Sequence, residues 1–262
     1  MNKRIFNLKI NFGHHPNSLT FNHIQLSQTK IDYRSRFKFI YDQGNLGSCT
    51  ANSLCYCYIF DYPNYNPSRL FLYHNQLVLQ NNMNDVGSTL ENCINAFNKY
   101  GLCTEKSWPY IISKFRITPS VLSYQEATKC PKNNGVRVSQ TLSALKGCLA
   151  SGEPFICGFL VFSSFMSLNV ARTGYVPMPK RNEQLLGGHA VICVGYDDTK
   201  QVFIMLNSWG SKWGDKGFFY LPYSYLTNLN LAGDFWKLVV NNQKPVKTIK
   251  YNKNILKIYH KI

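Results

Sequence analysis

The sequence lacks any hydrophobic run long enough to cross a membrane as a helix. Its longest apolar stretch is residues 155–162, whereas a membrane-spanning helix needs about 20 apolar residues. The basic N-terminus, residues 1–10, also lacks the apolar centre of a secretory signal. These absences predict no membrane span. They favour a chain that stays inside a cell or is packaged in a particle over one that is secreted by the classical route.

Charged side chains are scarce, at 16% of the 262 residues, and their signs are unbalanced, with a net charge of +16. Residues 1–40 hold seven basic and one acidic residue, and residues 241–262 hold six lysines and no acid. The two flanks therefore carry most of the positive charge, and the centre is nearly neutral. The flanks are either ordinary solvated segments or contacts for an anionic partner, such as nucleic acid or an anionic surface.

The nine cysteines lack the pairing that a metal site needs. No CxxC pair occurs, and no histidine stands close by at ligand spacing, so a zinc site is not expected and no cofactor is implied. Nine is an odd number, so at least one thiol is free or bonded to another chain. Most of the others are expected to be small core residues.

Apolar patterning divides the chain into a helical half and a strand-rich half. Helices are predicted at residues 49–60, 68–80, 88–100 and 141–151. Strands are predicted at residues 155–162, 189–196, 202–207 and 217–221. This order indicates an α+β protein of two lobes, with a left lobe at about 41–135 and a right lobe at about 136–240. Residues 1–30 are then a basic arm or short pro-segment, and residues 241–262 form a basic tail.

Cys49 differs from the other cysteines in its setting, which is Asp42-Gln-Gly-Asn-Leu-Gly-Ser-Cys49. The two glycines allow a tight turn, and the cysteine then opens the apolar helix predicted at 49–60. At a helix N-terminus the unpaired N–H groups and the helix dipole favour a thiolate over a thiol. Because the thiolate is the nucleophilic form, Cys49 is the candidate nucleophile.

A nucleophilic thiol needs a proton acceptor, and histidine serves best near neutral pH. Four of the six histidines lie in the flanks, at positions 14, 15, 23 and 260. His74 falls inside a predicted helix and is expected to be an ordinary surface or half-buried residue. His189 follows two glycines and opens an apolar strand, where small neighbours leave room for a substrate. Taken alone, it fits a hydrogen-bonded core histidine equally well.

A third motif is Leu206-Asn207-Ser-Trp209-Gly210. An asparagine at the end of a strand can accept a hydrogen bond from an imidazole and thereby set the orientation of the ring. Trp209 is then in a position to cover that contact. On its own, the motif is equally compatible with a turn that carries a packing tryptophan.

In combination, the order Gln43, Cys49, His189, Asn207 resembles the papain family of cysteine peptidases. The histidine and the asparagine follow the cysteine by 140 and 158 residues, and the family places them roughly 130–150 residues downstream. Further matches are Trp213-Gly-Asp-Lys-Gly217, Lys99-Tyr-Gly-Leu102 and Trp108-Pro-Tyr110. The resemblance covers about residues 31–240 and is closer to bacterial and viral members than to lysosomal ones.

The resemblance implies a helical left lobe and a β-barrel-like right lobe, with the active-site cleft between them. Cys49 would stand on the left wall and His189 on the right, with Asn207 orienting the histidine. Gln43 and the Cys49 N–H would stabilise the oxyanion of an acyl transfer through a thioester, with protein or peptide substrates. The substrate is expected to contact Gly87, Ser88, Gly188 and Trp209.

The chain also departs from the family pattern. Leu46 replaces a disulfide-forming cysteine, and Thr50 replaces a tryptophan. No long left-lobe insertion with a histidine pair is present, which favours an endopeptidase. Residues 1–30 are too short for the family's long pro-peptide, but they are long enough to block the cleft and be cleaved off near residues 25–36. The alternatives are a catalytically weak homologue that binds through its basic flanks, and a peptide ligase or transamidase.

Overall fold

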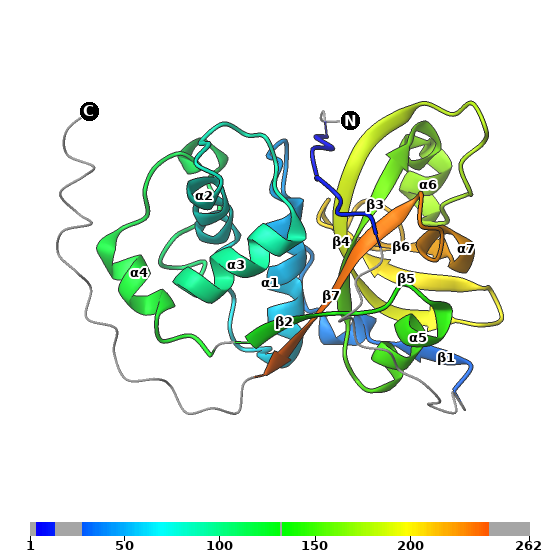
Figure 1. Cartoon of the computed structure of the whole chain (residues 1–262), viewed down its shortest axis with the longest axis horizontal. Helices are drawn as coiled ribbons and strands as arrows, with labels where there is room; N and C mark the ends of the chain where they lie inside the picture. Colours follow the sequence, from blue (N-terminus) through cyan, green and yellow to red (C-terminus); the bar gives the residue numbers. More distant parts are fainter. Residues whose placement is uncertain (1–3, 14–27, 132, 241–262) are drawn as a thin grey trace.

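The computed structural model describes residues 4–13, 28–131 and 133–240. The left part of the molecule is built from helices (Figure 1). Their bounds are α1 Cys49–Asp61, α2 Arg69–Leu79, α3 Leu90–Tyr100 and α4 Val121–Ala127, with a 3-10 turn η2 at Ile112–Lys114. The sequence therefore correctly predicted a helical left lobe.

The right lobe is an antiparallel sheet with the order β2-β7-β3-β4-β5-β6, and β1 pairs with β4 beside this path. The strands are β1 Lys30–Asp32, β2 Asn133–Arg137, β3 Phe155–Phe162, β4 Leu185–Asp197, β5 Val202–Leu206, β6 Phe218–Pro222 and β7 Ala232–Val240. The remaining elements are η1 Arg34–Arg36, α5 Leu142–Ala150, η3 Ser163–Met166, α6 Leu168–Thr173 and α7 Tyr223–Leu226. The predicted α+β class is thereby confirmed.

The four predicted helices and four predicted strands are all present. Helix starts carry side-chain caps, because Ser68 accepts from the Phe71 N–H and Thr89 from the Asn92 N–H. Gly101, with φ at +75°, ends α3 in a conformation that favours glycine. Strand β7 was not predicted, and β4 begins at Leu185, earlier than predicted, so that His189 lies inside the strand.

Helix α1 is the central element of the fold. Its residues Cys49 to Phe60 are all buried, which explains why the sequence shows no polar face there. One core joins α1, α2 and α3 to the sheet face formed by β4 and β5. A second core lies within the right lobe, where α5 and η3 pack on the other side of the same strands. Helix α1 thus joins the helical lobe to the sheet.

All nine cysteines are buried and none forms a disulfide. The sequence predicted this for most of them, and they act as small core side chains. His74 contradicts its prediction, since it is only 2% exposed and its Nδ1 lies 3.0 Å from the carbonyl oxygen of Phe115. Burial of α2 on both sides explains this difference.

Residues 4–13 lie between the two lobes, as the dark blue trace in Figure 1 shows. We call this segment the N-terminal arm. Asn7 pairs with Gly188 of β4 in an isolated parallel bridge.

Three regions singled out in the sequence lie outside the described residues. They are the histidine pair at 14–15, residues 25–27 of the expected cleavage region and the basic tail at 241–262. Within the described residues, no helix is both long and apolar enough to cross a membrane.

Candidate active site

Cys49 is the first residue of α1, as the sequence predicted, and it is 1% exposed. Ser48 occupies the N-cap position and contributes no side-chain cap. Its hydroxyl instead lies 2.6 Å from the Tyr110 hydroxyl and accepts a hydrogen bond from Asn52 at 3.0 Å. The turn before the helix is therefore held by side chains.

His189 lies on β4 and is fully buried. Its Nε2 is 2.9 Å from Oδ1 of Asn207, the residue directly after β5. Within the described residues, Nδ1 of His189 has no hydrogen-bond partner. A ring with one nitrogen held by an amide and the other free is oriented to exchange a proton through the free nitrogen.

Aromatic rings close around this histidine. The Trp209 ring lies 5.3 Å from the His189 ring, centroid to centroid, at an angle of 34°. Phe159 packs edge-on from the other side at 5.9 Å. Trp209 itself is only 4% exposed. The Trp209 ring thus lies against the His189 ring, which also contacts Asn207.

Gln43 is buried beside the loop that leads to Cys49. Its Nε2 donates to the carbonyl oxygen of Leu46 at 2.9 Å, and its Oε1 accepts from the Ser208 hydroxyl at 2.6 Å. The Gln43 backbone N–H also donates to the Ser208 carbonyl at 2.9 Å. These contacts fix the amide plane and leave the second N–H of Nε2 available for an oxyanion.

Burial governs the protonation states of Cys49 and His189 in this form of the protein. Burial raises the pKa of the Cys49 thiol to about 11, although the backbone N–H groups of Ala190 and Thr50 oppose this shift. Burial also lowers the pKa of His189 to about 4, and the Asn207 hydrogen bond only partly offsets it. The thiol and the imidazole are therefore both neutral near pH 7. The Ala190 contact also places the Cys49 sulfur beside the residue that follows His189.

The N-terminal arm occupies the cleft over this pair. The Leu8 N–H donates to the Gly188 carbonyl at 3.2 Å, and the Lys9 N–H donates to the Ser88 carbonyl at 3.3 Å. Phe6 packs edge-on against both His189 and Trp209, at 6.2 and 5.8 Å between centroids. The backbone groups predicted to bind a substrate are thus occupied by the chain's own N-terminus.

Glycines let the arm approach this closely. A Cβ on Gly87, whose φ is +69°, would lie 2.3 Å from the Asn7 carbonyl oxygen. A Cβ on Gly188 would lie 2.5 Å from the Leu8 carbonyl oxygen. Both positions therefore need glycine for a main chain to lie in the cleft, which supports the sequence-based choice of these two residues.

The structure adds a residue that sequence reasoning missed. Asp85 accepts the Gly47 N–H at 3.0 and 3.1 Å through its two carboxylate oxygens, and it also accepts from the Tyr73 hydroxyl. Its backbone carbonyl accepts from Nδ2 of Asn7 at 3.1 Å. Asp85 therefore ties the turn before Cys49 to the segment that carries Gly87. In the sequence, the only sign of this role is that Asp85 stands two residues before Gly87.

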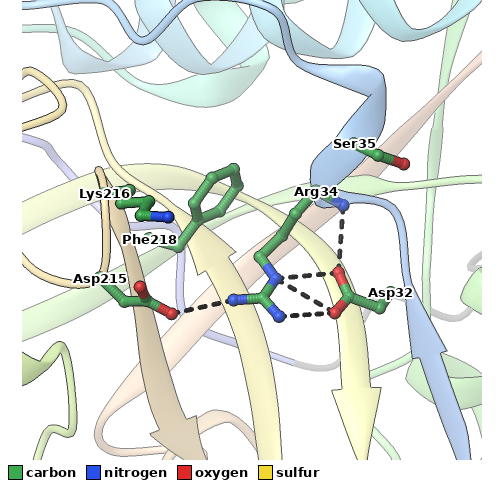
Figure 2. Close-up of a pocket in the computed structure, with 6 residues that line it drawn as sticks. All are labelled: Asp32, Arg34, Ser35, Asp215, Lys216 and Phe218. Atoms are coloured by element: carbon green, nitrogen blue, oxygen red, sulfur yellow. Dashed lines mark hydrogen bonds and ion pairs between the residues drawn. The ribbon is translucent and has the colours of Figure 1, made fainter.

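A separate pocket is lined by Asp32, Arg34, Ser35, Asp215, Lys216 and Phe218 (Figure 2). Arg34 lies across it, with a two-pronged contact to Asp32 and a 2.9 Å contact to Asp215. Tyr220 also receives a bond from Arg34 at 2.9 Å. Because Asp32, Arg34 and Asp215 pair with one another, they hold β1 to the turn before β6.

Comparison with known proteins agrees with this geometry. The sequence profile described as papain family cysteine protease matches residues 27–232. An uncharacterized peptidase C1-like protein of Acanthamoeba polyphaga mimivirus is 42% identical over 225 residues, which cover 78% of this chain and 72% of that protein. A cathepsin L-like proteinase of Fasciola hepatica is 28% identical over 199 residues, or 72% of this chain and 58% of that protein.

Among solved structures, xylellain, a cysteine protease from Xylella fastidiosa, superposes with a TM-score of 0.83 at 33% identity. The match covers 92% of this chain and 99% of xylellain. Digestive procathepsin L 3 of Tenebrio molitor shares the fold, with a TM-score of 0.65 at 17% identity over 88% of this chain and 75% of that one.

The fold, together with these comparisons, defines a cysteine protease. The chain belongs to the papain family of cysteine proteases. Its similarity to a viral and a bacterial protein agrees with the grouping suggested by the motifs.

Proposed function

We propose that the chain is a cysteine endopeptidase in which Cys49 attacks a peptide carbonyl and His189 accepts the thiol proton. One observation carries this proposal. The imidazole is held through Nε2 by Asn207, while its buried Nδ1 has no partner within the described residues. A buried and oriented ring nitrogen without a partner, on the residue directly before the Ala190 backbone that contacts the Cys49 sulfur, is suited to proton exchange with that thiol.

The mechanism follows from the surrounding donors. The Cys49 proton moves to His189, and the sulfur forms a bond to the substrate carbonyl carbon. The oxyanion accepts hydrogen bonds from the Cys49 N–H and from the second N–H of Gln43 Nε2. The amine leaves with the proton from His189. A water molecule, deprotonated by the same ring, then hydrolyses the thioester and restores the thiol.

The course of the arm supports internal cleavage of polypeptides. The arm passes from Trp209, which Arg4 and Phe6 contact, across the catalytic pair to Ser88, which receives the Lys9 N–H. It then continues to Ile10, whose side chain lies against Gly158 and Gly233. An extended chain thus runs through the site with polypeptide on both sides, as an endopeptidase substrate must.

We further propose that the arm is an inhibitory pro-segment. It covers Cys49, and one buried side chain of the size of Leu8 contributes about 1.5–3 kcal/mol. The carbonyls of Gln28 and Thr29 accept bonds from Tyr196 and Asp198, and β1 begins at Lys30. Cleavage before Gln28 leaves these contacts intact. It also makes the arm a separate peptide, which loses its high local concentration and dissociates.

Covalent labelling tests the nucleophile. A labelled epoxide or vinyl-sulfone probe is expected to modify the wild-type chain at one thiol after arm release. Cys49→Ala is expected to abolish labelling, and His189→Ala is expected to reduce it strongly. Cys193→Ala changes an equally buried cysteine on β4 and is the matched control. Labelling that persists in Cys49→Ala would overturn the assignment.

N-terminal sequencing tests the arm. Wild type, incubated under conditions where the probe labels it, is expected to acquire a new N-terminus before Gln28. Cys49→Ala is expected to remain uncut. A wild-type enzyme that labels and cleaves peptides with an intact N-terminus would show that removal of the arm is not required. No contact in the described residues specifically supports the ligase, the transamidase or the inactive homologue.

A further inference from the structure

The N-terminal end of the arm is anchored by the side chain of Arg4. Its Nη1 donates to Oδ1 of Asp42 at 2.7 Å and to the carbonyl oxygen of Gly44 at 3.0 Å. Its Nη2 lies 3.5 Å from the carbonyl oxygen of Trp209. The guanidinium carbon lies 5.2 Å from the centre of the Trp209 ring. One guanidinium thus meets a carboxylate, two carbonyls and an indole.

These acceptors are held in place without Arg4. The Gly44 N–H donates to Oδ1 of Asp42 at 2.9 Å, which orients the carboxylate. Asp42 and Trp209 form an isolated antiparallel bridge, and the Gly210 N–H donates to the Tyr41 carbonyl at 2.8 Å. We call the Asp42 carboxylate, the carbonyls of Gly44 and Trp209 and the Trp209 ring the cradle. Its parts are held by the main chain of the protease domain.

One side of the cradle, at Asp42, is exposed to solvent, and its other side, at Trp209, borders the cleft. The Asp42 side chain is 54% exposed, whereas the Arg4 side chain is 14% exposed. The Trp209 ring packs at a tilt against the His189 ring, so the cradle begins next to the proposed catalytic histidine. It lies on the Trp209 side of the catalytic pair, and Ser88, which binds the other part of the arm, lies on the opposite side.

We propose that Asp42, the carbonyls of Gly44 and Trp209, and the Trp209 indole form a guanidinium-binding subsite of the cleft. Arg4 occupies this subsite in the covered form. Once the arm leaves, the subsite binds an arginine side chain of a substrate, on the Trp209 side of the bond that is cut. The substrate part of this inference rests on the proposed peptidase function.

The chemistry selects arginine among the natural side chains. The flat guanidinium presents several N–H donors in one plane and stacks on an aromatic ring, which suits a carboxylate, two carbonyls and an indole. A lysine ammonium is a compact point charge that cannot match this arrangement over the same ring. Citrulline has nearly the shape of arginine but no charge, and it is the matched probe.

Ligand binding tests the subsite without any catalysis. The full chain carrying Cys49→Ala and Arg4→Ala is titrated with Nα-acetyl-L-arginine amide and with the citrulline analogue, and the indole signal of Trp209 is followed by NMR. We expect the citrulline analogue to bind at least ten times more weakly. Adding Asp42→Asn, which keeps the oxygen that accepts the Gly44 N–H, is expected to weaken arginine binding to the same extent.

Two results would overturn the subsite. One is equal binding of the arginine and citrulline ligands, and the other is arginine binding that Asp42→Asn leaves unchanged. The Cys49→Ala chain that keeps Arg4 is expected to bind the arginine ligand at least ten times more weakly than the chain with both substitutions, because Arg4 occupies the subsite.

Peptide cleavage then tests the role in specificity. When the Arg4→Ala chain cleaves a peptide library, we expect arginine to be enriched at one substrate position on the Trp209 side of the cleaved bond. Adding Asp42→Asn should remove this enrichment. Cleavage without that enrichment would reject the substrate role. A chain that binds the arginine ligand but cleaves nothing would contradict the proposed peptidase function and leave the guanidinium site established.

Discussion

Leu8 of the N-terminal arm donates its backbone N–H to the carbonyl oxygen of Gly188, the residue directly before His189. Through this contact, the N-terminal arm occupies a main-chain acceptor of the residue next to the proposed catalytic histidine. Phe6 of the same arm also packs against the His189 ring.

Leu8→Asp is expected to release the arm. Leu8 is 7% exposed, so the change removes about 1.5–3 kcal/mol of apolar burial and adds the cost of burying a carboxylate. Alkylation of Cys49 at pH 8 is expected to accelerate at least roughly tenfold, since 1.4 kcal/mol corresponds to a factor of ten. Lys9→Gln changes an exposed neighbour and is the control. An unchanged rate in Leu8→Asp would exclude the arm as the barrier.

The pH dependence of alkylation is expected to change with the arm. The thiolate is the reactive form, so the rate rises with pH through the pKa of Cys49, which burial raises to about 11 in the covered form. In wild type the rate should still be rising at pH 10. In Leu8→Asp water reaches the site, the pKa falls, and the rate should level off at lower pH. Cys49→Ala gives the background from the other thiols, and identical profiles in both chains would contradict this account.

Asn207→Ala is expected to lower kcat/KM of the activated enzyme by roughly ten- to a hundredfold. The change removes one buried hydrogen bond of about 1.5–3 kcal/mol to an imidazole that becomes charged during the reaction. Asn207 Oδ1 lies 2.9 Å from His189 Nε2. Without this contact, the variant no longer holds the imidazole ring in its orientation. Asn230→Ala changes an exposed asparagine and should leave kcat/KM unchanged. Equal activities of the two variants would count against an orienting role.

Gln43→Ala is expected to lower kcat by roughly 10²–10³-fold with little change in KM, because an oxyanion donor acts mainly in the transition state. Gln43 also braces Leu46 and Ser208, so the thermal unfolding midpoint is measured in parallel. Gln125→Ala, on the exposed side of α4, is the control. A rise in KM at constant kcat would point to a substrate-binding role instead.

Arg137→Met is expected to destabilise the fold by about 3–5 kcal/mol, since it leaves a buried carboxylate without its cation. Arg137 Nη1 lies 3.0 Å from Oδ1 of Asp234, whose side chain is 1% exposed, and the guanidinium stacks on Trp236 at 4.0 Å. Urea denaturation measures the loss. Arg116→Met, which removes a surface contact to Asn84, should change stability by less than about 0.5 kcal/mol.

Much of the fold was readable in the sequence because its signals are local. Ser68 before α2, Thr89 before α3 and Gly101 after α3 are cap residues at short range from the helices they bound. The strand at 155–162 was placed within its observed limits because it is apolar throughout. Strand β7 was missed, since Asp234 lies inside it at a positive φ and interrupts the apolar pattern.

The sequence by itself determined the chemical identities at the site. Cys49, His189, Asn207 and Gln43 stand in motifs whose spacing is a property of the chain. Only the tertiary structure decided which groups meet these motifs in space. The contacts of Arg4 with Asp42, of Leu8 with Gly188 and of Asp85 with Gly47 join segments whose separation in the chain leaves no periodic trace. They exist because the two lobes close on α1 and leave a groove that an extended N-terminus fills.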